Sequence, residues 1–280
     1  MASILMCYPE GRHKALTLSY DDGRFADRRL VEIFNRYGLK GTFHINAGLL
    51  GAPDRLAAEE AVKLYEGHEI SAHTLTHPTI ARCPNEQIIH EVMEDRRQLE
   101  RITGYPVRGM SYPNGSYSPR VKALLPGLGI QYARVVASTG QYGLPHDLLE
   151  WQPTCHHNYD LMKHAEAFAA LHKQQYLYLM YVWGHSYEFD NDNNWHLMEE
   201  FGAFIGGKSD IWYCTNMAFV DYVKAFENLR FAADLSFVYN PSAADVWLQT
   251  NGGTVQVKGG EQVSLKRQTE YDQGIDQRHC

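Results

Sequence analysis

The sequence predicts an α/β fold: a (β/α) barrel of about seven strands followed by a small antiparallel β appendage. Strand-like and helix-like stretches alternate over about 230 residues, which favours parallel strands covered by helices. About seven such units favour a barrel over an open sheet. After residue 235, short alternating runs are split by "NPS", "NGG" and "KGG", which is typical of antiparallel hairpins. We therefore expect a barrel over 1–232 and, over 233–280, a β appendage with a frayed tail.

The elements follow in order from apolar runs and the residues that end them. The first strand is "ALTLSY" (15–20), which stops at the turn signal "DDG". In "RRLVEIFNRYG" (28–38) the apolar residues share one helical face, and Gly38 ends the helix. Further strands are predicted at 41–47, 68–73, 107–112, 130–136, 176–184 and 210–215. Further helices are predicted at 57–67, 84–104, 118–129, 160–174, 194–207 and 217–230.

Composition excludes several classes of protein. The net charge of −7 argues against a nucleic-acid binder, and no apolar run is long enough to span a membrane. The first strand is not followed by GxGxxG, so a dinucleotide site has no support. The N-terminus has no basic segment of a signal peptide, and the five cysteines are scattered and odd in number. We therefore expect a cytoplasmic protein with reduced thiols. The sequence does not distinguish a monomer from a homo-oligomer.

Polar residues collect at the predicted strand ends, where (β/α) barrels carry their catalytic groups. The first strand ends in Asp21 and Asp22, another in His73, and the apolar strand "YLYLMYVWG" is followed by His185. In "HTLTH", His73 and His77 are four residues apart, a spacing that can bring two imidazoles together but is weak alone among 14 histidines. One carboxylate and two imidazoles make a zinc-type site with an open position. A second carboxylate and a third histidine remain for acid and base chemistry.

The same residues resemble the motifs of a known family. "LSYDDG" resembles its first motif, TFDDG, and "HTLTH" matches its second, H[ST]xxH. "SYPNG" resembles the third, "LEWQP" weakly the fourth, and "YVWGHS" the last. This is the polysaccharide deacetylase family, also called the NodB homology domain or carbohydrate esterase family 4, and the resemblance covers roughly residues 15–230. It implies a distorted (β/α) barrel and metal-dependent removal of acyl groups, usually acetyl from N-acetylated sugars, with a small molecule or an oligosaccharide as the substrate.

The resemblance also implies roles for single residues. Asp22, His73 and His77 are expected to hold one divalent metal ion, with zinc preferred and cobalt, nickel or manganese as alternatives. Asp21 is expected to be the general base and His185 the general acid.

Two further residues are expected to face the substrate. The backbone N–H of Tyr112 is expected to stabilise the oxyanion, and Trp151 matches the tryptophan that packs beside the acid histidine. Glu150 takes the place of the aspartate that usually precedes this tryptophan. His156 and His157 either line the pocket or are exposed.

The cation that orients the base departs from the family pattern. The family's third motif usually has an arginine where this chain has Ser111. Arg108 on the same predicted strand and Arg134 on the next can replace it, and the alternation in "YAR" favours Arg134.

Three functions stay open at this point. The first is a metal-dependent hydrolase that removes acetyl groups from an N-acetylated or O-acetylated carbohydrate or a related small molecule. The second is hydrolysis of a non-sugar C–N bond in the same fold, as in allantoinases and cyclic imidases. The third is a catalytically silent barrel that binds carbohydrate.

Overall fold

A computed structural model of the chain describes residues 4–265. Lys14–Val220 forms one compact unit, and the described residues before Lys14 group with those after Val220 in a second unit. The division falls within α8 (Asn216–Glu227), whereas the predicted boundary at 232/233 stays a prediction. The predicted frayed tail lies outside the described residues. Within them, no helix is both long and apolar enough to cross a bilayer.

The larger unit is built on an eight-stranded parallel sheet, and the predicted distorted (β/α) barrel is confirmed. Seven strands follow one another in the order β6-β5-β4-β3-β2-β8-β7, and β9 pairs with β2. A parallel bridge between Arg134 and Trp151 links β6 to the segment that leads into β7, so the sheet curls back toward its own start. The strands are β2 (Lys14–Asp21), β3 (Gly41–Ile45), β4 (Glu69–Ala72), β5 (Gly109–Ser111), β6 (Tyr132–Arg134), β7 (Cys155–His156), β8 (Tyr178–Gly184) and β9 (Ile211–Tyr213).

Strand β2 is the centre of this sheet, and all of its residues are buried. It pairs with β8 on one side along nearly its whole length. On the other side it pairs first with β9 and then, from Leu18 onward, with β3. Burial on both faces explains why "ALTLSY" is continuously apolar or small rather than alternating. The carboxyl end of β2, with Asp21 and the following Asp22, is thereby fixed by both neighbours.

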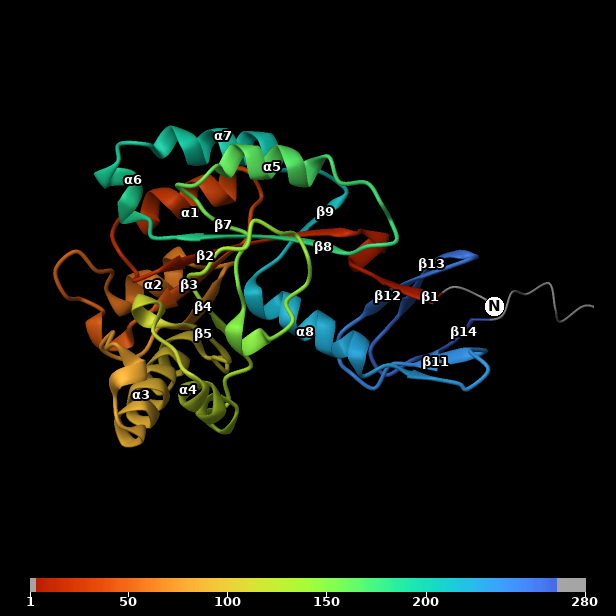
Figure 1. Cartoon of the computed structure of the whole chain (residues 1–280), viewed down its shortest axis with the longest axis horizontal. Coiled ribbons are helices and arrows are strands. Elements are labelled where there is room, and N and C mark those ends of the chain that lie inside the picture. Colours follow the sequence, from red (N-terminus) through yellow and green to blue (C-terminus); the bar gives the residue numbers. More distant parts are fainter. Residues whose placement is uncertain (1–3, 266–280) are drawn as a thin grey trace, which may run out of the picture. The chain divides into compact units, whose positions relative to one another are not determined.

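Helices lie on both sides of the sheet (Figure 1), with α1 and α7 together on one side and α3 and α4 on the other. The amphipathic pattern of α1 buries Leu30, Val31, Ile33 and Phe34. The longest helix, α3, ends as predicted at Gly104, which has a left-handed backbone with φ of 75°. The helices are α1 (Asp27–Arg36), α2 (Ala58–Leu64), α3 (Asn85–Thr103), α4 (Pro119–Leu124), α5 (Leu161–Ala169), α6 (Tyr187–Asn191), α7 (Trp195–Ile205) and α8. Short 3-10 helices occur at Pro9–Gly11, Ala47–Leu49, Ile80–Arg82, Pro113–Gly115, Leu125–Leu128 and Leu148–Glu150.

The smaller unit contains two antiparallel three-stranded sheets, as predicted for the β appendage. One has the order β1-β12-β13, and the other β10-β11-β14. The "NGG" signal forms the expected tight hairpin, since Thr250 pairs with Gly253. The sequence prediction left out the four-residue strand β1, because its partner comes from the far end of the chain. The strands are β1 (Ile4–Cys7), β10 (Arg230–Phe231), β11 (Phe237–Tyr239), β12 (Val246–Thr250), β13 (Gly253–Val257) and β14 (Gln262–Ser264).

Candidate active site

The carboxyl ends of the parallel strands converge on Asp21, the last residue of β2. Its side chain is only 3% exposed, and five strands or the loops after them each supply it with a polar neighbour. These are Arg134 of β6 in direct contact, Ser111 Oγ of β5 at 3.0 Å, His44 Nδ1 of β3 at 3.4 Å, His73 Nε2 after β4 at 3.9 Å and His185 Nε2 after β8 at 4.0 Å. A carboxylate surrounded in this way is the centre of the site rather than an isolated turn residue.

Arg134 is the cation that pairs with this carboxylate, as the sequence pattern predicted. Its side chain is fully buried and donates to Asp21 Oδ2, while its guanidinium lies 4.5 Å from the centroid of the Trp183 ring. Burial alone would raise the pKa of Asp21, but Arg134, with help from His73, outweighs burial and holds that pKa well below its usual range. Arg108 precedes β5, at the opposite end of the strand from Ser111. Of the two predicted cations, the structure brings only Arg134 to Asp21.

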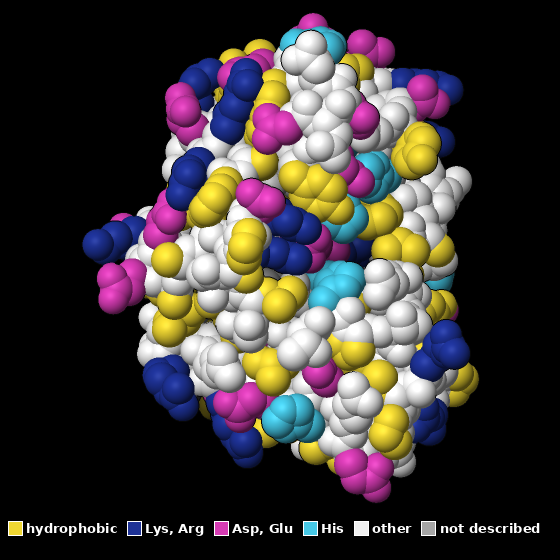
Figure 2. Space-filling model, turned by 90° about the vertical axis from the view of Figure 1, so that its left-hand side faces the viewer, with side chains coloured by type: hydrophobic (Ala, Val, Ile, Leu, Met, Phe, Trp, Pro, Cys, Tyr) yellow, Lys and Arg dark blue, Asp and Glu magenta, His cyan; other side chains and the backbone are white. Residues whose placement is uncertain are grey.

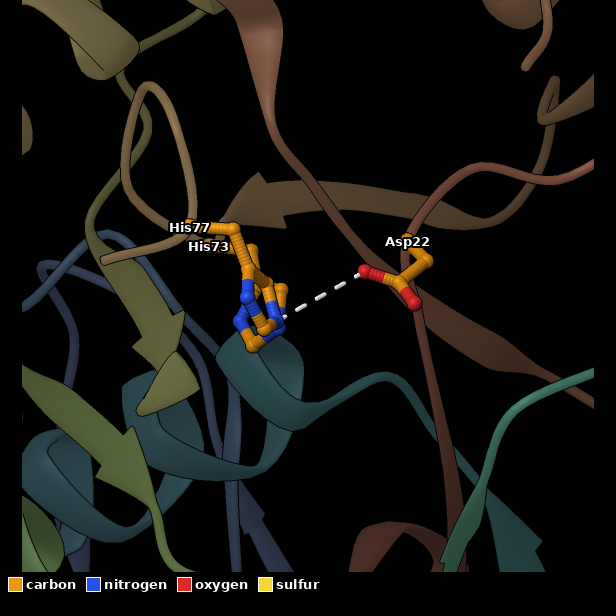
Figure 3. Close-up of side chains that lie close together, drawn as sticks. All are labelled: Asp22, His73 and His77. Carbon is orange, nitrogen blue, oxygen red and sulfur yellow. Dashed lines mark ion pairs between the residues drawn. The ribbon is translucent and has the colours of Figure 1, made fainter. Parts of the chain in front are cut away.

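Asp22, His73 and His77 form a second group beside this carboxylate. One ligand atom from each lies within 4.8 Å of the others, and Asp22 Oδ1 is 3.8 Å from His77 Nε2. Figure 3 shows the imidazoles of His73 and His77, which come from one loop, together on one side and the carboxylate of Asp22 facing them. An ion bound at about 2.0–2.2 Å to each donor in a tetrahedron holds its donors roughly 3.5 Å apart, close to the spacing found here. The donor types and their spacing therefore fit the predicted divalent ion.

The loop that carries both histidines is fixed by hydrogen bonds to β5 and to α3. His73 Nδ1 donates to the Ser111 carbonyl oxygen (3.0 Å), which leaves Nε2 as the nitrogen with a free lone pair. Burial lowers the pKa of His73 to about 4, so the ring is neutral, as a ligand must be. Further along the loop, Thr76 donates its backbone N–H and its hydroxyl to the carboxylate of Glu91 on α3. The ring of His73 is thus fixed in orientation and in tautomer.

Two of the three predicted ligands have an unusual backbone. Asp22 has φ of 87° and His77 has φ of 63°, in the left-handed region that non-glycine residues rarely occupy. The reversal at Asp22 comes directly after extended β2, so Asp21 and Asp22 point to different partners although they are adjacent in sequence. Such conformations cost about 1–3 kcal/mol each and concentrate at functional sites.

His185 directly follows β8 and is held by Glu188. Its backbone N–H donates to Glu188 Oε2 (3.0 Å), its Nδ1 lies 3.2 Å from Glu188 Oε1, and its Nε2 faces Asp21. Burial alone would lower the pKa of His185, but the adjacent carboxylate of Glu188 and the charge of Asp21 outweigh burial and raise it. A raised pKa with Nε2 aimed at the base is what a general acid requires.

Glu188 has a second partner in His156. The two approach to 3.1 Å between Nε2 and Oε2. The backbone N–H of Asn158 donates to His156 Nδ1 (3.2 Å), so the proton of the neutral ring is on Nε2 and points at Glu188. His156, His157 and Glu188 also lie close enough to hold a metal ion, but a protonated Nε2 cannot act as a ligand. We interpret this group as a hydrogen-bonded support for His185.

His157 is packed rather than pocket-lining. It is fully buried and stacks on Phe189 (centroids 4.1 Å apart) and on Tyr20 (5.6 Å). A Cβ at Gly184 would lie 2.0 Å from His157 Nδ1, so only glycine fits at the end of β8. His157 therefore neither lines the pocket nor is exposed, which were the two alternatives that the sequence left open.

The structure places the predicted substrate-facing residues differently from the expectation. The Tyr112 N–H donates to the Arg134 carbonyl oxygen (3.0 Å) within the sheet, so the geometry does not support it as an oxyanion donor. Trp151 is buried in the barrel against Tyr181 (4.7 Å), whereas the ring neighbours found for His185 in residues 4–265 are Trp183 (5.9 Å) and Tyr187 (5.3 Å).

Glu150 also differs from the acid it replaces in the motif. Its carboxylate accepts hydrogen bonds from Lys122 (2.6 Å) and Tyr117 (2.8 Å). The carboxylate beside His185 comes instead from Glu188, which no motif marks.

Three residues around the site were not predicted from the sequence: His44, Trp183 and Glu188. His44 lies directly beside Asp21 in the register of β2 and β3, and a histidine inside the apolar strand "GTFHINA" was its signal. The signal for Glu188 was its spacing of three residues from His185 at the start of a short helix.

Comparison with known proteins points to one family. Residues 9–133 match the family model for polysaccharide deacetylases, a stretch that includes Asp21 and the three predicted ligands but ends before Arg134 and His185. Chitin deacetylase 1 of Cryptococcus neoformans is 29% identical over 115 residues, which are 40% of this chain and 24% of that protein. A chitooligosaccharide deacetylase of Rhizobium leguminosarum is 25% identical over 125 residues, 41% of this chain and 52% of that protein. The matches thus span only a quarter to a half of these relatives.

A solved structure extends the likeness of the fold over most of the chain. The family 4 acetyl xylan esterase of Clostridium thermocellum, solved in complex with a cobalt ion, has a TM-score of 0.53 at 14% identity and covers 75% of this chain and 92% of that one. At this identity the likeness concerns the fold alone. The predicted resemblance to the polysaccharide deacetylases is therefore confirmed over the matched stretch, residues 9–133, and the likeness over most of the chain is one of fold.

Proposed function

We propose that this chain is a metal-dependent deacetylase that removes acetyl groups from an N-acetylated or O-acetylated carbohydrate or a related small molecule. The observation that carries the proposal is the position of Asp21 between a buried cation, Arg134, and a histidine, His185, with an imidazole and carboxylate ligand set alongside. The names of the matched relatives, which describe deacetylases of chitin and chitooligosaccharides, favour this activity over cyclic-ureide hydrolysis and over a silent barrel.

Asp21 is the base in this proposal. Arg134 keeps it ionised. Ser111 and His44 hold the Oδ1 side of the carboxylate, so Oδ2 is the oxygen that faces His73 and His185, beside Arg134. An ionised carboxylate in this position accepts a proton from water as the water oxygen bonds to the acyl carbon.

His185 is the acid. Its Nδ1 is directed to Glu188, so Nε2 is the nitrogen that gives up a proton. That proton goes to the leaving nitrogen or oxygen as its bond to the acyl carbon breaks, and acetate and the free amine or alcohol are released.

Asp22, His73 and His77 are the residues that would hold a divalent ion. When bound, such an ion supplies Lewis acidity, polarising the acyl oxygen and stabilising negative charge that develops on it. The ligand set alone does not distinguish zinc from cobalt, nickel or manganese, because all four accept nitrogen and oxygen donors.

The proposal is tested by metal analysis together with a product screen. The purified chain is incubated with N-acetylated chitooligosaccharides, acetylated xylan and allantoin, and acetate and ammonia are assayed separately. We expect about one divalent ion per chain and release of acetate. Ammonia from allantoin without acetate would favour the second activity, and bound sugar without any product would favour the silent barrel.

A further inference from the structure

Two arginines, Arg24 and Arg55, lie beside the predicted metal ligands. Their backbones form an antiparallel bridge, which directs opposed side chains to the same face. Arg55 is committed to Asp22: its Nη1 lies 3.2 Å from Asp22 Oδ1 and donates to the Asp22 carbonyl oxygen, and its side chain is 11% exposed. Arg55 therefore belongs to the support of the ligand set.

Arg24 has no such partner. No carboxylate of residues 4–265 lies within ion-pair distance of it, and its buried Nε atom has no hydrogen-bond acceptor. Its guanidinium lies 5.1 Å from the centroid of the Tyr187 ring, a cation–π contact that fixes the plane of the group without neutralising its charge. Two like charges facing each other across a bridge are unfavourable unless something compensates them.

Arg24 lies close to the predicted reacting groups. The Tyr187 ring beneath it is 5.3 Å from the ring of His185, and its neighbour Arg55 contacts Asp22. Figure 2 shows basic, acidic and histidine side chains side by side near the middle of the face in view. An anionic group on a molecule bound between His185 and Asp22 would meet this guanidinium.

The charges of the site leave Arg24 in excess. Asp21 is neutralised by Arg134, Glu188 is paired with His185, and Asp22 is shared between Arg55 and the predicted ion. A guanidinium presents a planar fork of donors that matches a carboxylate, and it binds such a group most strongly where water is partly excluded.

We propose that Arg24, on its Tyr187 platform, binds a carboxylate of the substrate, so that the preferred substrates are acidic acylated compounds. This inference rests on the proposed deacetylase function. Two sources of the carboxylate fit the same chemistry, an acidic N-acyl sugar and an N-acyl amino acid.

Binding of two matched pairs of compounds tests the proposal and separates these sources. One pair is N-acetylmuramic acid and N-acetylglucosamine, and the other is N-acetylglycine and N-acetylglycinamide. Dissociation constants are measured by calorimetry or ligand-observed NMR with the purified full chain. We expect the acidic member of at least one pair to bind roughly tenfold or more tightly, the range for a charge-assisted hydrogen bond. We expect this preference to shrink as sodium chloride is raised.

The variant Arg24→Gln should abolish the preference, and Arg24→Lys, which keeps the charge but loses the fork, should retain part of it. Arg97→Gln, which removes an exposed arginine paired with Glu94 on α3, is the matched control and should leave it unchanged. Equal affinity for both members of both pairs, or a preference that survives in Arg24→Gln, would overturn the proposal.

Acetate release from the same compounds distinguishes the two proposals. A carboxylate preference that depends on Arg24, without acetate from any compound, would leave the anion site standing and remove the deacetylase function. Equal acetate release from the neutral and acidic members, unchanged in Arg24→Gln, would support the deacetylase function and remove the anion site.

Discussion

Ser111 and Arg134 are paired directly across β5 and β6, and both side chains contact Asp21. The family's third motif usually has an arginine where Ser111 stands. In this chain the cation comes from the neighbouring strand at the same level of the sheet, and the serine hydroxyl occupies the space beside it. Asp21 therefore has a buried arginine as its partner, although this arginine comes from a different position in the sequence than the family motif predicts.

Replacing Arg134 should affect both catalysis and stability. In Arg134→Gln the pKa of Asp21 should rise, because no cation then outweighs the effect of burial. Asp21 becomes protonated at a higher pH, so the acid limb of the pH–rate profile should move to higher pH. At neutral pH the buried carboxylate loses its partner, which should cost about 3–5 kcal/mol in urea unfolding. Because the folded pKa of Asp21 is depressed, this loss should fade as the pH falls toward that pKa. The variant Arg108→Gln is the control. An equal shift of the acid limb in both variants would contradict the assignment of Arg134 as the cation that keeps Asp21 ionised.

The adjacent carboxylates should respond differently to the same substitution. Asp21→Asn keeps the shape and removes the proton acceptor, so metal should stay bound while turnover falls about 10²–10⁴-fold. Asp22→Asn should instead lower metal affinity. Metal content and kcat are measured on both variants; release of metal by Asp21→Asn and retention by Asp22→Asn would mean that the two roles are exchanged.

The ligand histidines should be required for metal but not for folding. In His73→Ala or His77→Ala we expect bound metal and activity to be lost together, while circular dichroism stays that of the unchanged protein. His90→Ala, on the exposed face of α3, is the control. Undiminished metal stoichiometry in both ligand variants would disprove the site.

Glu188 should set the alkaline limb of the pH–rate profile. His185 must be protonated to act as an acid, so activity falls as the pH rises through its pKa, which lies above the ordinary histidine value. Glu188→Gln removes the negative charge that lies 3.2 Å from His185 Nδ1, so this limb should move to lower pH. Asp192→Asn, which alters an exposed carboxylate bonded to Asn158, should not move it. A limb that stays in place in Glu188→Gln would show that another group is the acid.

The buried thiols of the described residues should be free, and those of Cys7 and Cys155 should react slowly in the folded chain. Burial raises the pKa of Cys7 to about 11 and that of Cys155 to about 12, so little thiolate exists at neutral pH. Titration of the denatured, unreduced protein should find close to five thiols, of which Cys280 lies outside the described residues. A count near one would mean two disulfides, against the predicted cytoplasmic location, which stays a prediction.

The sequence predicted those parts of the fold and site that depend on local pattern. The strand before Asp21 and the histidine pair of "HTLTH" follow from apolar runs and short spacings. Alternation within "YAR" also gave Arg134, because successive side chains of a strand point to opposite faces.

The remainder depends on sheet register and on which strands become neighbours. Glu188 meets His156 only because β7 and β8 pair, and His44 meets Asp21 only because β3 lies beside β2. The Tyr112 N–H was expected to be available, yet the pairing of β5 with β6 uses it. No single stretch of sequence contains these relationships.

The left-handed backbone at Asp22 and His77 has a consequence for how an ion would be bound. The sheet and α3 impose these conformations, so the donors are already arranged when the ion arrives, and little conformational entropy is lost on binding. A cage preorganised in this way adapts poorly to ions that demand another geometry. Metal preference in this protein should therefore be determined by the rigidity of the loop around the donors as much as by their chemical type.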